Sequence, residues 1–94
     1  MIIDREKRTL NATIDKWNFE ADHISNNSIK IFIYSKDPST FGNKFVGFYN
    51  PQTEDIKPLY YNSHMDYRGK EPTNRQKEKI KKYCDKLLKN IAEG

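Results

Sequence analysis

The sequence predicts an α+β domain, in which a three- or four-stranded antiparallel meander is flanked by an N-terminal helix and a long C-terminal amphipathic helix. Apolar residues recur every three or four positions near both ends of the chain, which is the period of a helix. In the middle they recur every second position, which is the period of a strand. The connections between the expected strands are too short for crossover helices. The 94 residues suit a single domain, which we expect to cover residues 1–94.

The first expected element is a helix at residues 4–16. Asp4 is suited to cap it, and Ile3, Leu10 and Ile14 follow a helical repeat with one polar interruption. The charged residues directly after Asp4 suit an exposed first turn. This helix would turn its apolar stripe toward the core.

The clearest strand is expected at residues 28–35. Its isoleucines fall on one face of a pleated strand, while Lys30, Phe32 and Tyr34 fall on the other. β-branched and aromatic residues dominate the segment, as is typical of a half-buried strand. If both helices pack on the aliphatic face, the other face displays aromatic rings beside lysine.

Two further strands are expected at residues 44–49 and 56–61, and turn-forming residues precede each of them. Pro58 cannot donate a hydrogen bond to a ladder, so its strand should lie at an edge of the sheet. A fourth strand at residues 18–24 is left open, with residues 25–27 as its turn into the next strand.

The C-terminal helix is expected over residues 74–92. Thr73 and Gln76 have the spacing of a capping box, in which each side chain accepts a hydrogen bond from the backbone N–H of the other residue. Pro72 lies just outside, where it does not interrupt the helix. Six apolar residues then recur at helical spacing: Ile80, Tyr83, Cys84, Leu87, Leu88 and Ile91.

The formal net charge of +4 is unevenly distributed along the chain. The segment from Arg68 to Lys89 has nine basic and three acidic residues, which gives +6, while the other residues carry eight basic and ten acidic side chains, which gives −2. Such asymmetry is typical of proteins that contact a polyanion. The alternative is a solvated helix face that keeps the protein in solution.

The cations of the C-terminal helix gather on the face opposite its apolar stripe. At 100° per residue, five of them fall within about 80° of one another, and this row has the spacing to follow phosphates. Two more cations extend the row into the preceding loop. The predicted nucleic-acid-binding residues are Arg68, Lys70, Arg75, Lys79, Lys82, Lys86 and Lys89.

Aromatic residues of the strands are the second candidate group. Phe32 and Tyr34 could stack unpaired bases beside lysines, as aromatic sheet faces do in RNA-binding modules. Tyr60 and Tyr61, near the predicted edge, could instead anchor a protein partner. The alternative for all of these rings is packing in the core of a small domain.

The sequence contains no catalytic or cofactor-binding pattern, so we expect neither an enzyme nor a bound cofactor or metal. Cys84 is the single cysteine, which excludes an intramolecular disulfide and a multi-cysteine metal site. Asp55 and Lys57 have the spacing of half a metal-dependent nuclease site, but this site would also need Asp22 or Asp37. None of the four glycines is placed as a nucleotide-binding loop requires.

The composition also indicates a setting for the protein. No apolar run approaches the roughly 18 residues of a membrane span, and the first eight residues mix acids and bases where a secretory signal would be apolar. With the lone cysteine, this predicts a cytoplasmic protein. Lys, Asn and Ile supply 32 of the 94 residues, and their A/T-rich codons indicate an AT-rich source such as a phage or another mobile element.

Two functions fit these observations. The first is a small basic accessory protein that binds the backbone of DNA or RNA; because only four of the 17 cations are Arg, non-specific or shape-based binding is expected. The alternative is a protein-binding module, such as a phage-encoded inhibitor or adaptor of a host defence or replication enzyme. The expected helix–strands–helix order is similar in layout to double-stranded-RNA-binding domains, and its strands-then-helix part to arm-type DNA-binding domains of recombinases; no residue carries over. A homodimer is left open.

Overall fold

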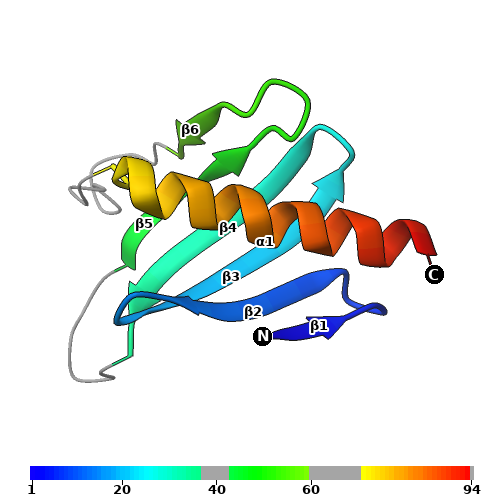
Figure 1. Cartoon of the computed structure of the whole chain (residues 1–94), viewed down its shortest axis with the longest axis horizontal. Coiled ribbons are helices and arrows are strands. Elements are labelled where there is room, and N and C mark those ends of the chain that lie inside the picture. The colour runs from blue at the N-terminus through cyan, green and yellow to red at the C-terminus, as the bar shows by residue number, and fades with distance from the viewer. Residues whose placement is uncertain (37–42, 60–70, 94) are drawn as a thin grey trace.

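A computed structural model describes residues 1–36, 43–59 and 71–93. Within these residues the chain forms six strands and one helix, which lies across one face of the sheet (Figure 1). The strand order is β1-β2-β3-β4-β5-β6, and each neighbouring pair is antiparallel. The elements are β1 (Ile2–Asp4), β2 (Thr9–Ile14), β3 (Trp17–Ser25), β4 (Ser28–Ser35), β5 (Asn43–Tyr49), β6 (Ile56–Pro58) and α1 (Asn74–Glu93).

The predicted fold class is wrong in its N-terminal part, because residues 4–16 form no helix. They belong to β1, the following loop and β2, so the sheet has six strands and not three or four. In β2, Leu10 and Ile14 are buried while Asn11 and Thr13 are exposed, which is strand alternation. The spacing of four between the two apolar residues is even, so it fits a period of two as well as a helical turn. Without this helix, the layout shared with double-stranded-RNA-binding domains is lost.

The strand left open at residues 18–24 is confirmed as β3. A tight turn joins it to β2, since Ile14 pairs with Trp17, and the turn residue Asp15 has a φ of 53°. Asp tolerates this left-handed conformation better than most residues do. β6 lies at the edge of the sheet, as Pro58 predicts. The strand that was expected at residues 56–61 is shorter in the structure, because β6 ends at Pro58 and Leu59 is not part of it; residues 60 and 61 lie outside the described residues.

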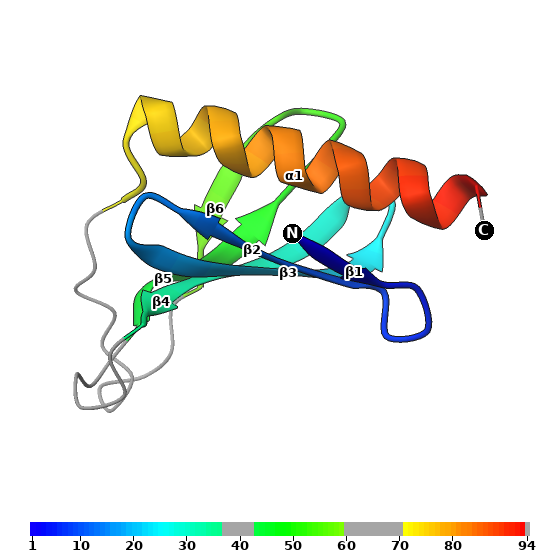
Figure 2. The same ribbon diagram turned by 60° about the horizontal axis from the view of Figure 1, so that its bottom comes forward.

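The core lies between α1 and one face of the sheet (Figure 2). The predicted apolar stripe of α1 is confirmed, and the helix contacts mainly β2 and β3. The ring of Tyr83 stacks on that of Phe19, with 5.5 Å between the ring centroids. The fully buried core residues are Leu10, Ile14, Phe19, Ala21, Ile29, Ile31, Ile33, Phe45, Tyr49, Ile80, Cys84 and Leu87.

The absence of a side chain at Gly47 allows a close approach between β5 and β6. A Cβ atom at this position would lie 2.5 Å from the backbone oxygen of Lys57 and 2.6 Å from the ring of Phe45. Gly47 pairs with Pro58 on β6. The edge strand can therefore close over the core only because this position of β5 has no side chain.

The start of α1 has the predicted capping box. The backbone N–H of Thr73 donates to Oε1 of Gln76 at 3.0 Å, and the backbone N–H of Gln76 donates to Oγ1 of Thr73 at 3.2 Å. Gln76 is itself buried, and its Nε2 donates to Oδ2 of Asp15 at 3.4 Å. The cap thus also holds the start of the helix against the β2–β3 turn.

Two further hydrogen bonds fix the rotation of α1 about its axis. The hydroxyl of Tyr83 donates to the backbone oxygen of Thr13 at 2.9 Å, and Nε of Arg5 donates to Oδ1 of Asn90 at 2.7 Å. Both bonds lie on the side of the helix that faces β1 and β2. Together with the apolar stripe, they determine which side chains of α1 face outward.

We predict that Thr73→Ala lowers the free energy of unfolding by about 1 kcal/mol, the usual cost of losing a helix cap. Urea unfolding followed by circular dichroism measures it. Thr73→Ser is the matched control, since it retains a capping hydroxyl and should keep most of the stability. Equal stability of the Ala variant and the wild type would contradict a role for this cap.

Candidate nucleic-acid interface

Three exposed lysines lie along the outer face of α1: Lys82, Lys86 and Lys89. We call them the helix ridge. None of them forms an ion pair with a residue in the described parts of the chain. Seven residues of helix separate the first from the last, which corresponds to about 10 Å along the axis. The ridge therefore presents three positive charges along one line that no described carboxylate neutralises by an ion pair.

Two of the five cations predicted on this face are instead drawn toward the sheet. Nζ of Lys79 lies 3.6 Å from Oδ1 of Asp15, and the guanidinium of Arg75 lies 3.9 Å from the same oxygen. The side chain of Arg75 remains 77% exposed, but that of Lys79 is only 37% exposed. One carboxylate thus partly neutralises two cations of the predicted row.

Acidic residues reduce the potential of α1 further. Glu78, Asp85 and Glu93 are all exposed on the helix, and at 100° per residue they fall on or beside its outer face. On the flank of α1 opposite Lys79, Lys81 forms an ion pair with Glu54. The hydrogen bond and the charge of Glu54 raise the pKa of this lysine. The cationic surface of α1 is therefore narrower than the sequence alone indicates.

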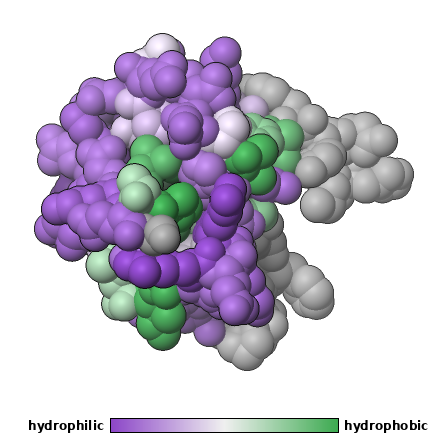
Figure 3. All heavy atoms as spheres, turned by 90° about the vertical axis from the view of Figure 1, so that its right-hand side faces the viewer, coloured by the Kyte–Doolittle hydropathy of each residue, from purple (hydrophilic) through white to green (hydrophobic). Residues whose placement is uncertain are grey.

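The β1–β2 loop, which was not predicted as part of the site, extends the basic surface. Arg5 is bonded to Asn90 near the end of α1, and Arg8 is exposed in the same loop. With Glu6 and Ile91 they line an open hollow of about 300 Å³. Figure 3 views this end of the molecule, whose surface is mainly hydrophilic with small hydrophobic areas between. The basic residues at positions 5–8 could have indicated this extension of the basic surface, but they were expected in the first turn of a helix.

The predicted stacking residues lie on the other side of the molecule. Phe32 and Tyr34 point to the sheet face opposite α1, where Phe48 and Lys30 also lie, since paired residues share a face. Nζ of Lys30 lies 5.2 Å from the ring centroid of Phe32. The sheet and about 10 Å of helix separate these rings from the helix ridge. The two predicted groups therefore do not form one continuous site.

The remaining predicted residues fall outside the described parts of the chain. Arg68 and Lys70, which were expected to extend the basic row, and Tyr60 and Tyr61, which were expected at the edge, all lie between residues 60 and 70. Their predicted roles stay predictions.

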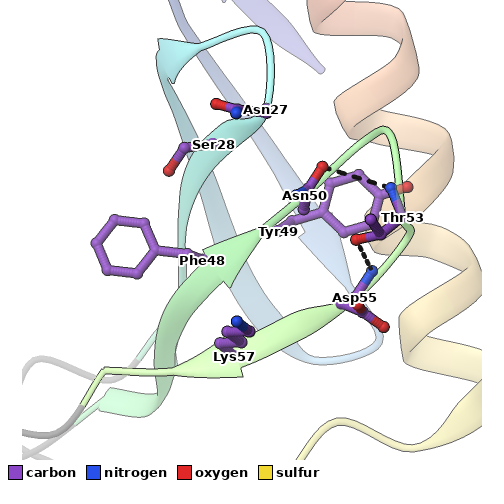
Figure 4. A pocket seen from close by; sticks show the side chains of 8 residues that line it. All are labelled: Asn27, Ser28, Phe48, Tyr49, Asn50, Thr53, Asp55 and Lys57. Carbon is purple, nitrogen blue, oxygen red and sulfur yellow. Dashed lines mark hydrogen bonds between the residues drawn. The ribbon is translucent and has the colours of Figure 1, made fainter.

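A second hollow, of about 380 Å³, lies between the β3–β4 turn and the β5–β6 loop (Figure 4). The side chain of Asn50 accepts hydrogen bonds from the backbone N–H groups of Gln52 and Thr53 at 2.9 and 3.4 Å, so it stabilises the loop. Asp55 and Lys57 are the charged residues that line the hollow. β4 and β5 separate them from Asp22, so Asp22 does not complete the nuclease pattern.

The described residues include no cluster of three or more His, Cys, Asp or Glu side chains that could hold a metal ion. Cys84 and Tyr49 are buried in the core, and burial, followed by the charge of Asp85, raises the pKa of each to about 12. The Cys84 thiol is therefore protonated and inaccessible in the folded protein, which suits packing and not nucleophilic chemistry.

These two pKa values predict a loss of stability at alkaline pH. From the ordinary pKa values of 9.0 for Cys84 and 10.0 for Tyr49 upward, the unfolded chain releases protons that the folded chain retains until about pH 12. The unfolded state then binds fewer protons, so the free energy of unfolding falls as pH rises. Between about pH 8 and pH 10 we expect a loss of about 1 to 2 kcal/mol, measured by urea unfolding. Cys84→Ala should lose less over the same interval, and a wild-type stability that is unchanged over this range would contradict the prediction.

Comparisons of the chain with protein-family models, with curated proteins and with solved structures found no significant match. The described part of the chain has no helix with the length and apolar character needed to span a membrane.

Proposed function

We propose that the protein binds the phosphate backbone of double-stranded nucleic acid through the helix ridge. The observation that carries this proposal is the set of three exposed lysines on the outer face of α1 that pair with no described carboxylate. Arg5 and Arg8 support it, because they add positive charge beside the last turns of the helix. Phosphate contacts from cations supply most of the sequence-independent affinity for nucleic acid.

The outer face of α1 has no aromatic side chain, and this favours duplex over single-stranded nucleic acid. The one aromatic residue of α1, Tyr83, is directed toward the sheet by its hydrogen bond to Thr13 and its contact with Phe19. A face without rings cannot stack unpaired bases, which is the main source of affinity for single strands. A duplex also has the higher charge density, so it gains more from three aligned lysines. Because the helix ridge itself consists of lysines, we expect little discrimination between sequences.

The first test compares two double charge reversals that change the net charge equally. Lys82→Glu with Lys89→Glu removes two members of the helix ridge, whereas Lys16→Glu with Lys36→Glu alters two exposed lysines that are not on α1. We expect the ridge variant to lose at least about tenfold in affinity for a duplex, and the control about threefold or less, since screening limits distant charges. Fluorescence anisotropy in low salt measures both. Equal losses would contradict a binding site on α1.

Salt dependence gives an internal check on the same complex. With three to five cations in contact, log affinity should fall against log salt with a slope of roughly −3 to −5 for duplex DNA. A single strand of equal length should bind more weakly. Tighter binding to the single strand would contradict the duplex assignment.

The position of Asp15 generates a second prediction. Because Asp15 partly neutralises Arg75 and Lys79, Asp15→Asn should free both cations for phosphates while keeping a residue that tolerates the left-handed φ. Duplex affinity should rise by about threefold or more, and the salt slope should steepen by roughly one to two. Anisotropy titrations at several salt concentrations measure both quantities. Unchanged or weaker binding would show that these two cations lie outside the interface.

The second candidate function is the protein-binding module. It is supported by the half-buried aromatic side chains on the sheet face opposite α1, since aromatic residues are enriched in protein interfaces. A pull-down from nuclease-treated lysate that recovers one stoichiometric protein would favour it over nucleic-acid binding. The origin in a phage or mobile element and the lack of enzyme activity stay predictions.

A further inference from the structure

The sheet face opposite α1, which we call the open face, is covered by no element in the described parts of the chain (Figure 2). Strand register places Asp22, Lys30, Phe48 and Lys57 in one row across β3 to β6. The neighbouring row contains Glu20 and Phe32, which are half-buried, and Val46, which is only 8% exposed. The open face therefore combines apolar surface with charges of both signs.

The charges on this face are segregated by strand. The carboxylates Glu20 and Asp22 lie on β3, and Asp4 of β1 lies in the row of Asp22. Lys30 lies on β4 and Lys57 on β6. The rings of Phe32 and Phe48 lie among the lysines. Two negative and two positive charges balance between β3 and β6, and Asp4 adds a third negative charge on β1, so the face has one acidic side and one basic, aromatic side.

Asp22 and Lys30 form no ion pair with any residue in the described parts of the chain, although they are direct neighbours across β3 and β4. No ion pair joins them, because Lys30 lies over the ring of Phe32 instead. Oδ1 of Asp22 is buried and has no hydrogen-bond partner among the described residues. A buried carboxylate oxygen without a partner is costly, and because Asp22 as a whole is only half-buried, a cation from outside can reach the carboxylate group and offset this cost.

The carboxylates disfavour nucleic acid on the open face. A strand stacked on Phe32 would bring its phosphates close to Glu20 and Asp22. Burial and the adjacent Asp22 already raise the pKa of the Glu20 carboxyl group, so this region disfavours further negative charge. A surface with an acidic side and a basic side matches a partner that has the same arrangement of charges in reverse.

We propose that this partner is a second copy of the chain, packed open face to open face in a two-sheet sandwich. A twofold axis that runs parallel to the strands between β3 and β4 places β4 of each protomer over β3 of the other. Because rotation about this axis preserves the rows, Lys30 of one protomer meets Asp22 of its partner, and the reciprocal pair forms as well. Packed sheets lie about 10 Å apart, a gap that these side chains can fill.

The area of the open face determines the expected affinity of the dimer. Neighbouring strands lie about 4.8 Å apart and each residue adds about 3.3 Å, so β2 to β6 offer roughly 400 to 500 Å² of face. A specific interface usually buries about 800 Å² per partner. We therefore expect a weak dimer with a Kd in the micromolar range. This proposal does not depend on nucleic-acid binding by α1.

Sedimentation of the nuclease-treated protein between about 1 µM and 1 mM tests the proposal, since that range brackets a micromolar Kd. The wild type should shift from monomer to dimer. Asp22→Lys and Lys30→Glu each create two like-charged contacts across the twofold axis, so each variant alone should dimerise at least about tenfold more weakly. Mixed in equal amounts, the two variants should associate again, because each reversed residue then meets its opposite charge.

The mixture distinguishes the loss of a contact between protomers from charge repulsion within one protomer. Each reversal also places like charges side by side within its own chain, and that effect persists in the mixture, whereas the contact between protomers is restored. Circular dichroism verifies that both variants fold. Lys82→Glu, which makes the same charge change on α1, is the matched control and should leave the Kd within about twofold.

Three results would overturn the proposal: a wild type that stays monomeric up to about 1 mM, variants that dimerise like the wild type, or single variants that remain monomeric when mixed. If the monomeric wild type binds a single-stranded oligonucleotide and Phe48→Ala abolishes that binding, the open face is a platform for unpaired bases instead. That result would not decide the proposed function of α1, which the duplex-binding experiments test separately.

Discussion

The packing of one helix on one face of a six-stranded sheet determines the rest of this structure. Ile80, Cys84 and Leu87 are fully buried, and they fix the side of α1 that faces inward. Burying aliphatic side chains of this size contributes on the order of 1.5 to 3 kcal/mol each, more than any exposed ion pair on the surface of α1. The lysines of the helix ridge face outward because of this apolar contact, not because of their own interactions.

Local patterns in the sequence predicted some of these elements and not others. α1 was predicted almost to the residue, because its cap, its apolar stripe and its length all indicate a helix. The strand at residues 28–35 was predicted for a similar reason, since isoleucines and aromatic residues alternate over its whole length. The segment at residues 4–16 failed because its apolar residues are few and their spacing of four suits both periods. The pairing of Leu10 with Ala21, 11 positions further along the chain, distinguishes the two structures, and the periodicity of residues 4–16 alone does not contain it.

The candidate site shows the same division between local and long-range information. Helical geometry placed Lys82, Lys86 and Lys89 on the outer face, as the structure confirms. It could not show that Asp15, some 60 residues earlier, would lie within 4 Å of Arg75 and Lys79, because that contact depends on where the β2–β3 turn meets the helix. Nor could it show that the rings of β4 lie on the opposite side of the sheet from the lysines. The sequence supplied the charges, but the effective surface depends on the tertiary fold.

The placement of α1 and the open face on opposite sides of one thin sheet has a geometric consequence. Occupation of one side leaves the other accessible, so the two surfaces can act at the same time. In the proposed sandwich, the two helices would lie on opposite outer sides, with axes about 30 Å apart if each layer adds about 10 Å. Each helix ridge would then face away from the other. Such a particle would be bivalent and could bridge two separate duplexes, so even a weak dimer would gain avidity when the duplexes are crowded together.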